Sequence, residues 1–248
     1  MSLETSLEPQ EQAWNDRPLL RRLYLEWYRT LADRLSPVAG RSIEVGSGIG
    51  KLRLVTGGRV VLTDVERTRW IDEQVDALHL PYEDGSLANI VMVDVFHHLA
   101  DPGRFLDEAT RSLAPGGRLL MVEPYCSPVS TFLYTRFHHE RTDLSADEFA
   151  VDQVSASAPM ESNQAIPTLA FYKHRRETLG RWASLSLVEE ERFAFVLYPL
   201  SGGFSRRPLV PAWLYTPLRG VERLLTPLAP ALAFRCLVVL QRTLSVSS

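Results

Sequence analysis

A short apolar segment over residues 41–45 runs directly into a turn that has glycine at every second position. Gly46 permits a sharp turn at the end of a strand, Gly48 lets the backbone approach a ligand closely, and Gly50 allows the following helix to pack against the sheet. Glu44 lies just before the turn and brings a carboxylate to the same place. The spacing differs from the dinucleotide pattern G-x-G-x-x-G and from a P-loop, so a tight turn without a ligand is the alternative.

Carboxylates also end the next strand-like segments, and the carboxyl ends of parallel strands are where open α/β sheets bind ligands. Asp64 closes the segment RVVLTD, where its carboxylate can accept hydrogen bonds from both hydroxyls of a ribose. Asp76 and Ala77 close a short third segment, where a carboxylate can accept a hydrogen bond from an adenine amine while Val65 flanks the ring. Asp94 ends the fourth segment. These positions favour a ligand that carries ribose and adenine groups.

Strands that alternate with helices must position these residues. Short apolar segments typical of buried strands lie at 41–45, 59–64, 74–77, 89–96, 118–124, 186–198 and 235–242. Helices are predicted over 12–36, 101–113, 128–138 and 165–183. Asp101 and Pro102 mark the start of the second helix, since aspartate caps a helix and proline suits its first turn. The alternation predicts a mostly parallel sheet.

The composition is that of a globular protein with little net charge. Of 248 residues, 45% are hydrophobic, and 27 basic against 30 acidic side chains leave a net charge of −3. This excludes extensive disorder and gives no indication of nucleic-acid binding. Two cysteines, Cys126 and Cys236, are too few for a disulfide framework or a zinc site. Residues 1–16 carry acids but no base, unlike a signal peptide, so we expect a cytoplasmic protein with one domain over 1–248.

The motifs follow one another in a recognisable order along residues 41–124. They are IEVGSGIG, LTDVE, VDALHLPYEDGS and IVMVDVFHHLADPGRFLDEATRSLAPGGRLLMVEP. This order resembles the class I S-adenosylmethionine-dependent methyltransferases, and in particular the small-molecule group called methyltransferase type 11. The resemblance implies an α/β, Rossmann-like, seven-stranded, mostly parallel sheet with a final antiparallel hairpin, flanked by helices. It also implies S-adenosyl-L-methionine as the cofactor.

The resemblance implies a role for each residue of the cofactor-binding core, 41–124. It assigns the methionine end of the cofactor to Glu44 and Gly46–Gly50, the ribose to Asp64, the adenine to Asp76 with Ala77, and the neighbourhood of the methionine to Asp94. One departure from the family is that the segments after the first two strands leave room only for short helices.

Histidines are the candidates for acid–base chemistry. The resemblance places the end of the fourth strand beside the transferred methyl group, which makes His97 and His98 candidates for a general base. His139 is a third candidate, next to Glu140 in the segment 125–163. Neighbouring residues on a helix diverge by about 100°, so we expect no metal site there. Histidines at a strand–helix junction also serve as caps or packing groups, and this alternative stays open.

The end of the chain differs from the rest in charge. Residues 199–248 carry six arginines and one acid, so this end has a net charge of +5 and the remainder −8. Together with 125–163, the segment 199–234 is predicted to cap the acceptor site. Arginines beside apolar and aromatic side chains suit peripheral contact of 199–240 with anionic lipid at the inner membrane surface. A lid that binds an acidic acceptor, and packing on the sheet alone, are the alternatives.

We therefore expect an enzyme that transfers a methyl group from S-adenosylmethionine to a small-molecule, sugar or lipid-linked (glycolipid-type) acceptor, most simply to oxygen. The alternatives are an N- or C-methyltransferase of a secondary metabolite and a cofactor-binding regulator or scaffold without turnover. The fourth strand lacks the D/N-P-P-Y/F sequence of amino-purine methyltransferases, and no basic patch accompanies the motifs. We accordingly expect no nucleic-acid partner.

Overall fold

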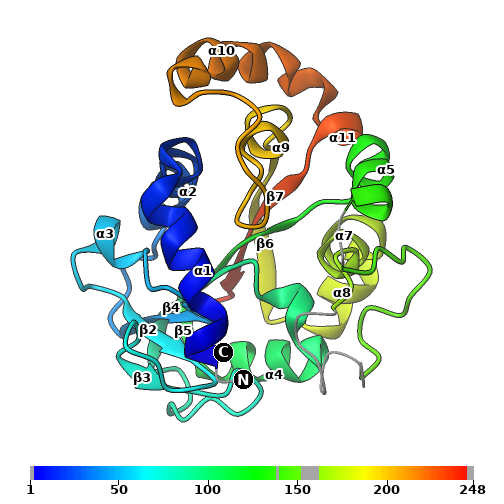
Figure 1. Ribbon diagram of the computed structural model, residues 1–248. Coiled ribbons are helices and arrows are strands. Elements are labelled where there is room, and N and C mark those ends of the chain that lie inside the picture. The colour runs from blue at the N-terminus through cyan, green and yellow to red at the C-terminus, as the bar shows by residue number, and fades with distance from the viewer. Residues whose placement is uncertain (1–2, 138–139, 152–161, 245–248) are drawn as a thin grey trace.

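A seven-stranded sheet forms the centre of the computed structural model, which describes residues 3–137, 140–151 and 162–244 (Figure 1). The strands are β1 (Arg41–Val45), β2 (Val61–Asp64), β3 (Glu73–Gln74), β4 (Leu87–Val93), β5 (Leu113–Pro124), β6 (Leu185–Phe193) and β7 (Arg235–Arg242). Their order in the sheet is β3-β2-β1-β4-β5-β7-β6. The first five pair in parallel and β7 is antiparallel to both neighbours, which confirms the predicted fold. The order reverses between β1 and β4, where such sheets bind ligands.

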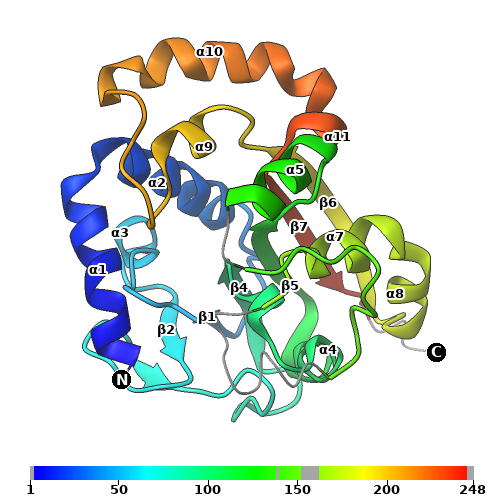
Figure 2. The same ribbon diagram turned by 45° about the vertical axis from the view of Figure 1, so that its right-hand side comes forward.

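Different helices cover the two faces of the sheet (Figure 2). In β4, Ile90 and Met92 belong to one core and Val91 to the other, as expected for a strand that is buried on both sides. The first face carries α4 (Pro102–Ser112), α7 (Ile166–Thr168), a π turn (Leu169–Lys173) and α8 (Arg175–Arg181). The second face carries α1 (Leu3–Asp16), α2 (Pro18–Ala32) and α3 (Arg53–Thr56).

The prediction of one helix over 12–36 is wrong, because two helices meet at Arg17. This residue has φ −117° and ψ 86°, outside the helical region. Pro18 follows it as the first residue of α2, and a proline disfavours helical geometry in the residue before it. The break lets α1 turn away from α2 and lie beside α3 and β2 (Figure 2).

Several predicted elements are confirmed and others differ in extent. α4 begins as predicted, with the Asp101 side chain accepting a hydrogen bond from Arg104 N at 2.8 Å. The third strand, predicted over 74–77, ends instead at Gln74, because Asp76 turns the chain by accepting a hydrogen bond from Leu78 N. The predicted helix over 165–183 is divided into α7, the π turn and α8.

A further group of helices lies beyond the carboxyl ends of β4 and β5. It consists of α5 (Pro128–Phe137), α9 (Leu197–Ser201), α10 (Tyr215–Leu225) and α11 (Ala229–Leu232), together with single 3₁₀ turns at Ala212–Leu214 and Thr226–Leu228. α10 forms the outer edge of the molecule in both views (Figures 1 and 2). Glu222 holds it in place, since this buried carboxylate accepts hydrogen bonds from Val196 N and Leu197 N, at 3.0 Å each. Among the described residues, no helix combines the length and apolar character that crossing a membrane requires.

Candidate functional site

The glycine loop after β1 is shaped by close contacts that leave no room for side chains at two positions. Gly46, Gly48 and Gly50 all have positive φ, at 67°, 49° and 64°. A Cβ on Gly46 would lie 2.5 Å from the Val95 side chain, and a Cβ on Gly50 would lie 2.6 Å from Trp70 O. Gly46 therefore brings the loop against the end of β4. Gly50 packs against the chain at Trp70 rather than placing a helix on the sheet.

Gly48 has more space, and the helix α1 lies over it. The nearest atom to a Cβ on Gly48 would be Leu7 Cδ2, at 3.8 Å. Leu7 is buried in the core formed by α1, α2 and the glycine loop. An ion pair of 2.9 Å between Lys51 Nζ and Glu11 Oε1 also ties α1 to the residue after the loop. The N-terminal helix thus covers the part of the loop that sequence analysis assigned to ligand contact.

Glu44 is a buried acid with an unused oxygen. Its side chain is 2% exposed, and Oε2 has no hydrogen-bond partner among the described residues. Burial raises the pKa of Glu44 to about 8, with the nearby Asp64 adding to the shift and a hydrogen bond with Ser47 opposing it. A buried carboxylate oxygen without a partner is costly. The arrangement therefore fits a ligand that brings a positively charged or hydrogen-bonding group to Oε2.

Asp64 connects the glycine loop to β2. Its Oδ2 accepts a hydrogen bond from Gly48 N at 3.0 Å, and its Oδ1 accepts one from Val65 N at 2.8 Å. Burial raises the pKa of Asp64, and these backbone hydrogen bonds oppose the shift. Asp76 follows β3, the neighbour of β2, and its side chain is half-exposed. Ala77 is buried and Val65 is exposed, so the predicted adenine side of the site has both an apolar floor and open residues.

Asp94 is part of a buried network that sequence analysis did not predict. It has φ 58°, the left-handed region that few non-glycine residues adopt. Its Oδ1 lies 2.5 Å from Arg235 Nη1, and its Oδ2 accepts a hydrogen bond from Tyr24 at 3.0 Å. Arg235 also donates to the Tyr198 hydroxyl. Burial raises the pKa of Asp94, and the Arg235 guanidinium opposes that shift.

Arg235 is the clearest residue that the sequence analysis missed, because it counted there only as one charge of the basic end. It is 5% exposed, and its Nε has no hydrogen-bond partner among the described residues. It opens β7 and pairs in register with Pro124, the last residue of β5. A charged residue at the start of the buried run CLVVL was the signal that could have identified it. The structure places this cation at the ligand-binding edge of the sheet.

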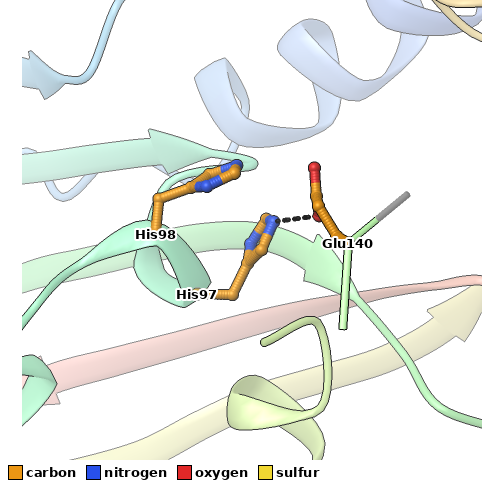
Figure 3. A group of neighbouring side chains, drawn as sticks. All are labelled: His97, His98 and Glu140. Carbon is orange, nitrogen blue, oxygen red and sulfur yellow. Dashed lines mark ion pairs between the residues drawn. The ribbon is translucent and has the colours of Figure 1, made fainter. Parts of the chain in front are cut away.

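His97 lies in the single 3₁₀ turn after β4, η1 (Phe96–His98), between two carboxylates. Its Nδ1 lies 2.6 Å from Glu123 Oε2, and its Nε2 lies 3.6 Å from Glu140 Oε2 (Figure 3). Glu123 is fixed in turn, because its Oε1 accepts hydrogen bonds from Val95 N and Phe96 N. Burial lowers the pKa of His97, but the two carboxylates outweigh burial and raise it to about 9.

His98 stands beside His97, with the ring centroids 4.1 Å apart. Its Nδ1 lies 2.8 Å from Ser162 Oγ, and Glu140 Oε2 accepts a hydrogen bond of 2.8 Å from Gln164 Nε2. The structure therefore brings the two predicted histidines together with Glu140, which follows them by more than forty positions in the chain. His139, the third predicted candidate, lies outside the described residues.

A cavity of about 190 Å³ borders His97. His97 forms part of its wall, with Leu99, Arg141, Glu148 and Ile166 among the other lining residues. The wall therefore combines apolar and charged groups, and it includes a stretch of the segment predicted to cap the acceptor site. This gives a small organic molecule space next to a charged imidazole.

Comparisons with known proteins agree with this geometry. Residues 43–121 match the family model described as a methyltransferase domain. Two similar curated proteins are the methyltransferase GfsG of Streptomyces halstedii, 32% identical over 114 residues, and the 27-O-demethylrifamycin SV methyltransferase of Amycolatopsis mediterranei, 32% identical over 116 residues. The matches cover 38% and 37% of this chain, and 41% and 43% of those proteins. The demethylmenaquinone methyltransferase of Thermus thermophilus is 27% identical over 186 residues, which cover 62% of this chain and 84% of that protein.

Solved structures show the same fold. A SAM-dependent methyltransferase from Archaeoglobus fulgidus has a TM-score of 0.54 at 13% identity, covering 90% of this chain and 94% of that one. The geranyl diphosphate C-methyltransferase from Streptomyces coelicolor A3(2) has a TM-score of 0.51 at 18% identity, covering 90% and 78%. With the strand order, these structures show that the chain has the fold of class I methyltransferases, and residues 43–121 are similar in sequence to a methyltransferase domain.

Proposed function

We propose that this protein binds S-adenosylmethionine and transfers its methyl group to a small-molecule acceptor, most directly to a hydroxyl oxygen. The observation that carries the proposal is the unpartnered, buried Oε2 of Glu44 beside the glycine loop. An ammonium group at that oxygen would satisfy it, as the methionine end of the cofactor requires. A Cβ on Gly48 would meet nothing closer than Leu7 Cδ2, at 3.8 Å, so the loop backbone beneath α1 has some space for the same ligand.

The remaining cofactor contacts follow the edge of the sheet. Asp64 would hold the ribose. Two backbone donors, Gly48 N and Val65 N, already fix the position of its buried carboxylate. Asp76 and Ala77, after the adjacent strand, would hold the adenine. Asp94 would stand beside the methionine end, because Val95 contacts Gly46.

S-adenosylmethionine supplies an electrophilic methyl group when it is bound, so the protein has to orient the acceptor and remove a proton. We assign the proton transfer to the cluster of His97, His98 and Glu140. His97 is already held in its charged form by Glu123 and Glu140. Burial raises the pKa of Glu140, but the hydrogen bond and charge of His97 outweigh burial and lower it, which makes Glu140 a weak base. Proton uptake therefore falls to His98, and His139 stays a prediction.

The acceptor class is proposed from the surroundings of the site. The cavity at His97 accommodates part of a small molecule, and its wall is partly apolar. Two similar proteins are named for quinone and antibiotic methylation, which supports an acceptor among secondary metabolites or quinones. A carbon or nitrogen acceptor remains the alternative, because an activated ring carbon also loses a proton to a base.

The proposal includes contact with an anionic lipid surface through residues 199–240, which would give access to a lipid-linked acceptor. Large apolar side chains on this segment are exposed to an unusual degree, namely Leu209 (75%), Trp213 (74%), Leu224 (81%) and Leu228 (54%). Arg206, Arg207 and Arg223 are exposed on the same segment. Exposed apolar side chains interspersed with arginines are typical of interfacial membrane binding.

Calorimetry with S-adenosylmethionine and with S-adenosylhomocysteine tests the first step. We expect saturable binding of each with one site per chain, and the absence of binding would remove the proposed function. Transfer is tested next, by incubating the protein with methyl-labelled cofactor and a metabolite extract and searching for products that carry the label. Cofactor binding without any labelled product would instead support the regulator or scaffold.

A further inference from the structure

We propose that His97, His98 and Glu140 form a binding site for one divalent transition-metal ion of the zinc class, which holds and activates the acceptor hydroxyl. The proposal deepens the proposed function and rests on it for the identity of the acceptor. The potential donor atoms of the three side chains all lie within 4.8 Å of one another. His97 Nε2 and Glu140 Oε2 are 3.6 Å apart, close to the separation of about 3.3 Å between donors of a tetrahedral zinc site.

The donor set selects the class of metal. Two imidazoles and one carboxylate are ligands that suit zinc and its neighbours in the first transition row, whereas magnesium and calcium prefer oxygen ligands alone. Three protein ligands also leave a coordination position open, which is the arrangement of catalytic rather than structural zinc sites. The cavity beside His97 is where an acceptor could approach that open position.

Each of the three side chains is oriented by a buried polar partner. Glu123 Oε2 accepts from His97 Nδ1 at 2.6 Å, and this hydrogen bond leaves Nε2 to face Glu140 (Figure 3). Ser162 Oγ contacts His98 Nδ1 at 2.8 Å, and Gln164 Nε2 donates to Glu140 Oε2 at 2.8 Å. The three partners are 0%, 0% and 4% exposed. Outer partners of this kind are what fix metal-binding histidines and carboxylates in proteins.

A simple ion pair does not explain this arrangement as well. It accounts for His97 and Glu140, but not for the third side chain or for its buried partner. Elsewhere in the described part of the chain, histidine and carboxylate meet only in pairs, at His79 with Asp76 and at His174 with Glu148. Those pairs are more exposed, with histidine side chains 71% and 38% exposed.

The position of the cluster suits a role in methyl transfer. His97 follows Val95 by two residues, and Val95 is the side chain that contacts the glycine loop at Gly46. A metal ion at the cluster would thus stand between the cofactor loop and the cavity. A bound divalent ion would displace the proton from His97 Nε2, and His98 would then bind the ion instead of taking up the acceptor proton. The ion would lower the pKa of a coordinated hydroxyl, so the O–H proton would leave to water and the oxygen would attack the methyl group. The new bond joins oxygen to carbon, and the electron pair of the broken bond stays on sulfur.

The experiment is a titration of the intact, chelator-treated protein with Zn²⁺, Co²⁺ and Mg²⁺. We expect one Zn²⁺ per chain, weaker binding of Mg²⁺, and visible d–d absorption on adding Co²⁺. His98→Ala and Glu140→Gln should each weaken Zn²⁺ binding by roughly 100-fold or more, while His174→Ala, at the matched histidine–glutamate pair, should leave it unchanged. Melting temperatures show whether each variant is folded.

The outcomes separate this inference from the proposed function. Failure of the wild-type protein to bind Zn²⁺ or Co²⁺ while it still binds S-adenosylmethionine would overturn the metal site alone. Zn²⁺ binding that persists in a folded His98→Ala and a folded Glu140→Gln variant would place the ion elsewhere and also overturn it. Loss of cofactor binding with the metal site intact would contradict only the proposed function.

Discussion

The proposed cofactor side and the proposed acceptor side of this protein are built in different ways. On the proposed cofactor side, the hydrogen bond from Gly48 N to Asp64 Oδ2 joins residues that are only 16 positions apart. The hydrogen bond from Val65 N to Asp64 Oδ1 joins neighbouring residues. On the proposed acceptor side, Ser162 meets His98 across 64 positions, and the pair of Asp94 and Arg235, which joins the two sides, spans 141. Short-range contacts make the cofactor side readable from the order of residues, whereas the acceptor side exists only in the folded chain.

The two sides also use charge differently. The proposed cofactor side leaves the buried Oε2 of Glu44 without a partner among the described residues. On the proposed acceptor side, His97 lies between two carboxylates, and Arg235 pairs with Asp94 of the cofactor side. At least three of the six arginines of the basic end make polar contacts with other residues of the chain. Arg235 binds Asp94, Arg219 binds Glu222, and Arg242 donates to backbone carbonyls. The arginines that form one basic segment in the sequence therefore have two roles in the structure. Some pair with other residues of the chain, and others lie on an exposed outer face.

The largest effect is expected at the pair that joins the two sides. Asp94→Asn removes the charge while keeping a residue that tolerates positive φ, and it leaves Arg235 buried without a counter-charge. We expect a loss of about 3–5 kcal/mol in the free energy of unfolding, measured with urea. The double variant Asp94→Asn/Arg235→Met should recover much of it. A loss below about 1 kcal/mol would mean that the pair does not bind the two sides together.

The next effect concerns the cofactor side alone. Asp64→Ala should weaken the binding of S-adenosylmethionine by roughly 30- to 100-fold, since it removes hydrogen bonds to a charged acceptor and frees the loop at Gly48. Asp76→Ala is the matched comparison, and its half-exposed carboxylate should cost less. Calorimetry on both variants checks this order. Equal losses of affinity, or a greater loss for Asp76→Ala, would show that the more buried carboxylate does not contribute more to cofactor binding.

Glu44 provides a pH-dependent effect. Its pKa is raised to about 8, so in the free protein at pH 7 it carries a proton that must leave when a cation binds. The affinity of the wild-type protein relative to Glu44→Gln should therefore rise with pH, by up to about tenfold per unit, and level off above pH 8. Taking the ratio cancels the ionisation of the ligand itself. A ratio independent of pH between 6 and 8 would contradict the assigned role.

The sequence contains enough to predict the glycine turn and the sheet, for reasons that the contacts explain. The glycine turn, Asp64 and the helix cap at Asp101 are local, so residue type and spacing determine them. The break at Arg17 was also local, but a regular leucine spacing concealed the effect of Pro18. The grouping of His98 with Glu140 was not readable, because it depends on how the chain after α5 returns to the sheet.

The exposed outer face gives the smallest effect on stability and the sharpest test of its own role. Trp213 and Leu224 are 74% and 81% exposed, so replacing both with serine should change the free energy of unfolding by only about 0.5 kcal/mol. In flotation with vesicles that contain phosphatidylglycerol, the wild-type protein should rise with the lipid at low salt and the double variant should not.

A matched control separates a lipid-binding face from exposed apolar residues in general. Leu54 in α3 is 63% exposed but lies apart from α10, because α2 stands between α3 and α10 in Figure 1, so Leu54→Ser should float like the wild-type protein. Arg223→Gln should weaken the free energy of binding to the vesicles by about 1 kcal/mol, because it reduces attraction to the anionic surface. Raising the salt concentration should also reduce the fraction of protein that floats, because salt screens this attraction. If the wild-type protein stays in the dense fraction at low salt, this face does not bind anionic lipid. Binding of an acidic acceptor would then be the remaining explanation for its exposed arginines.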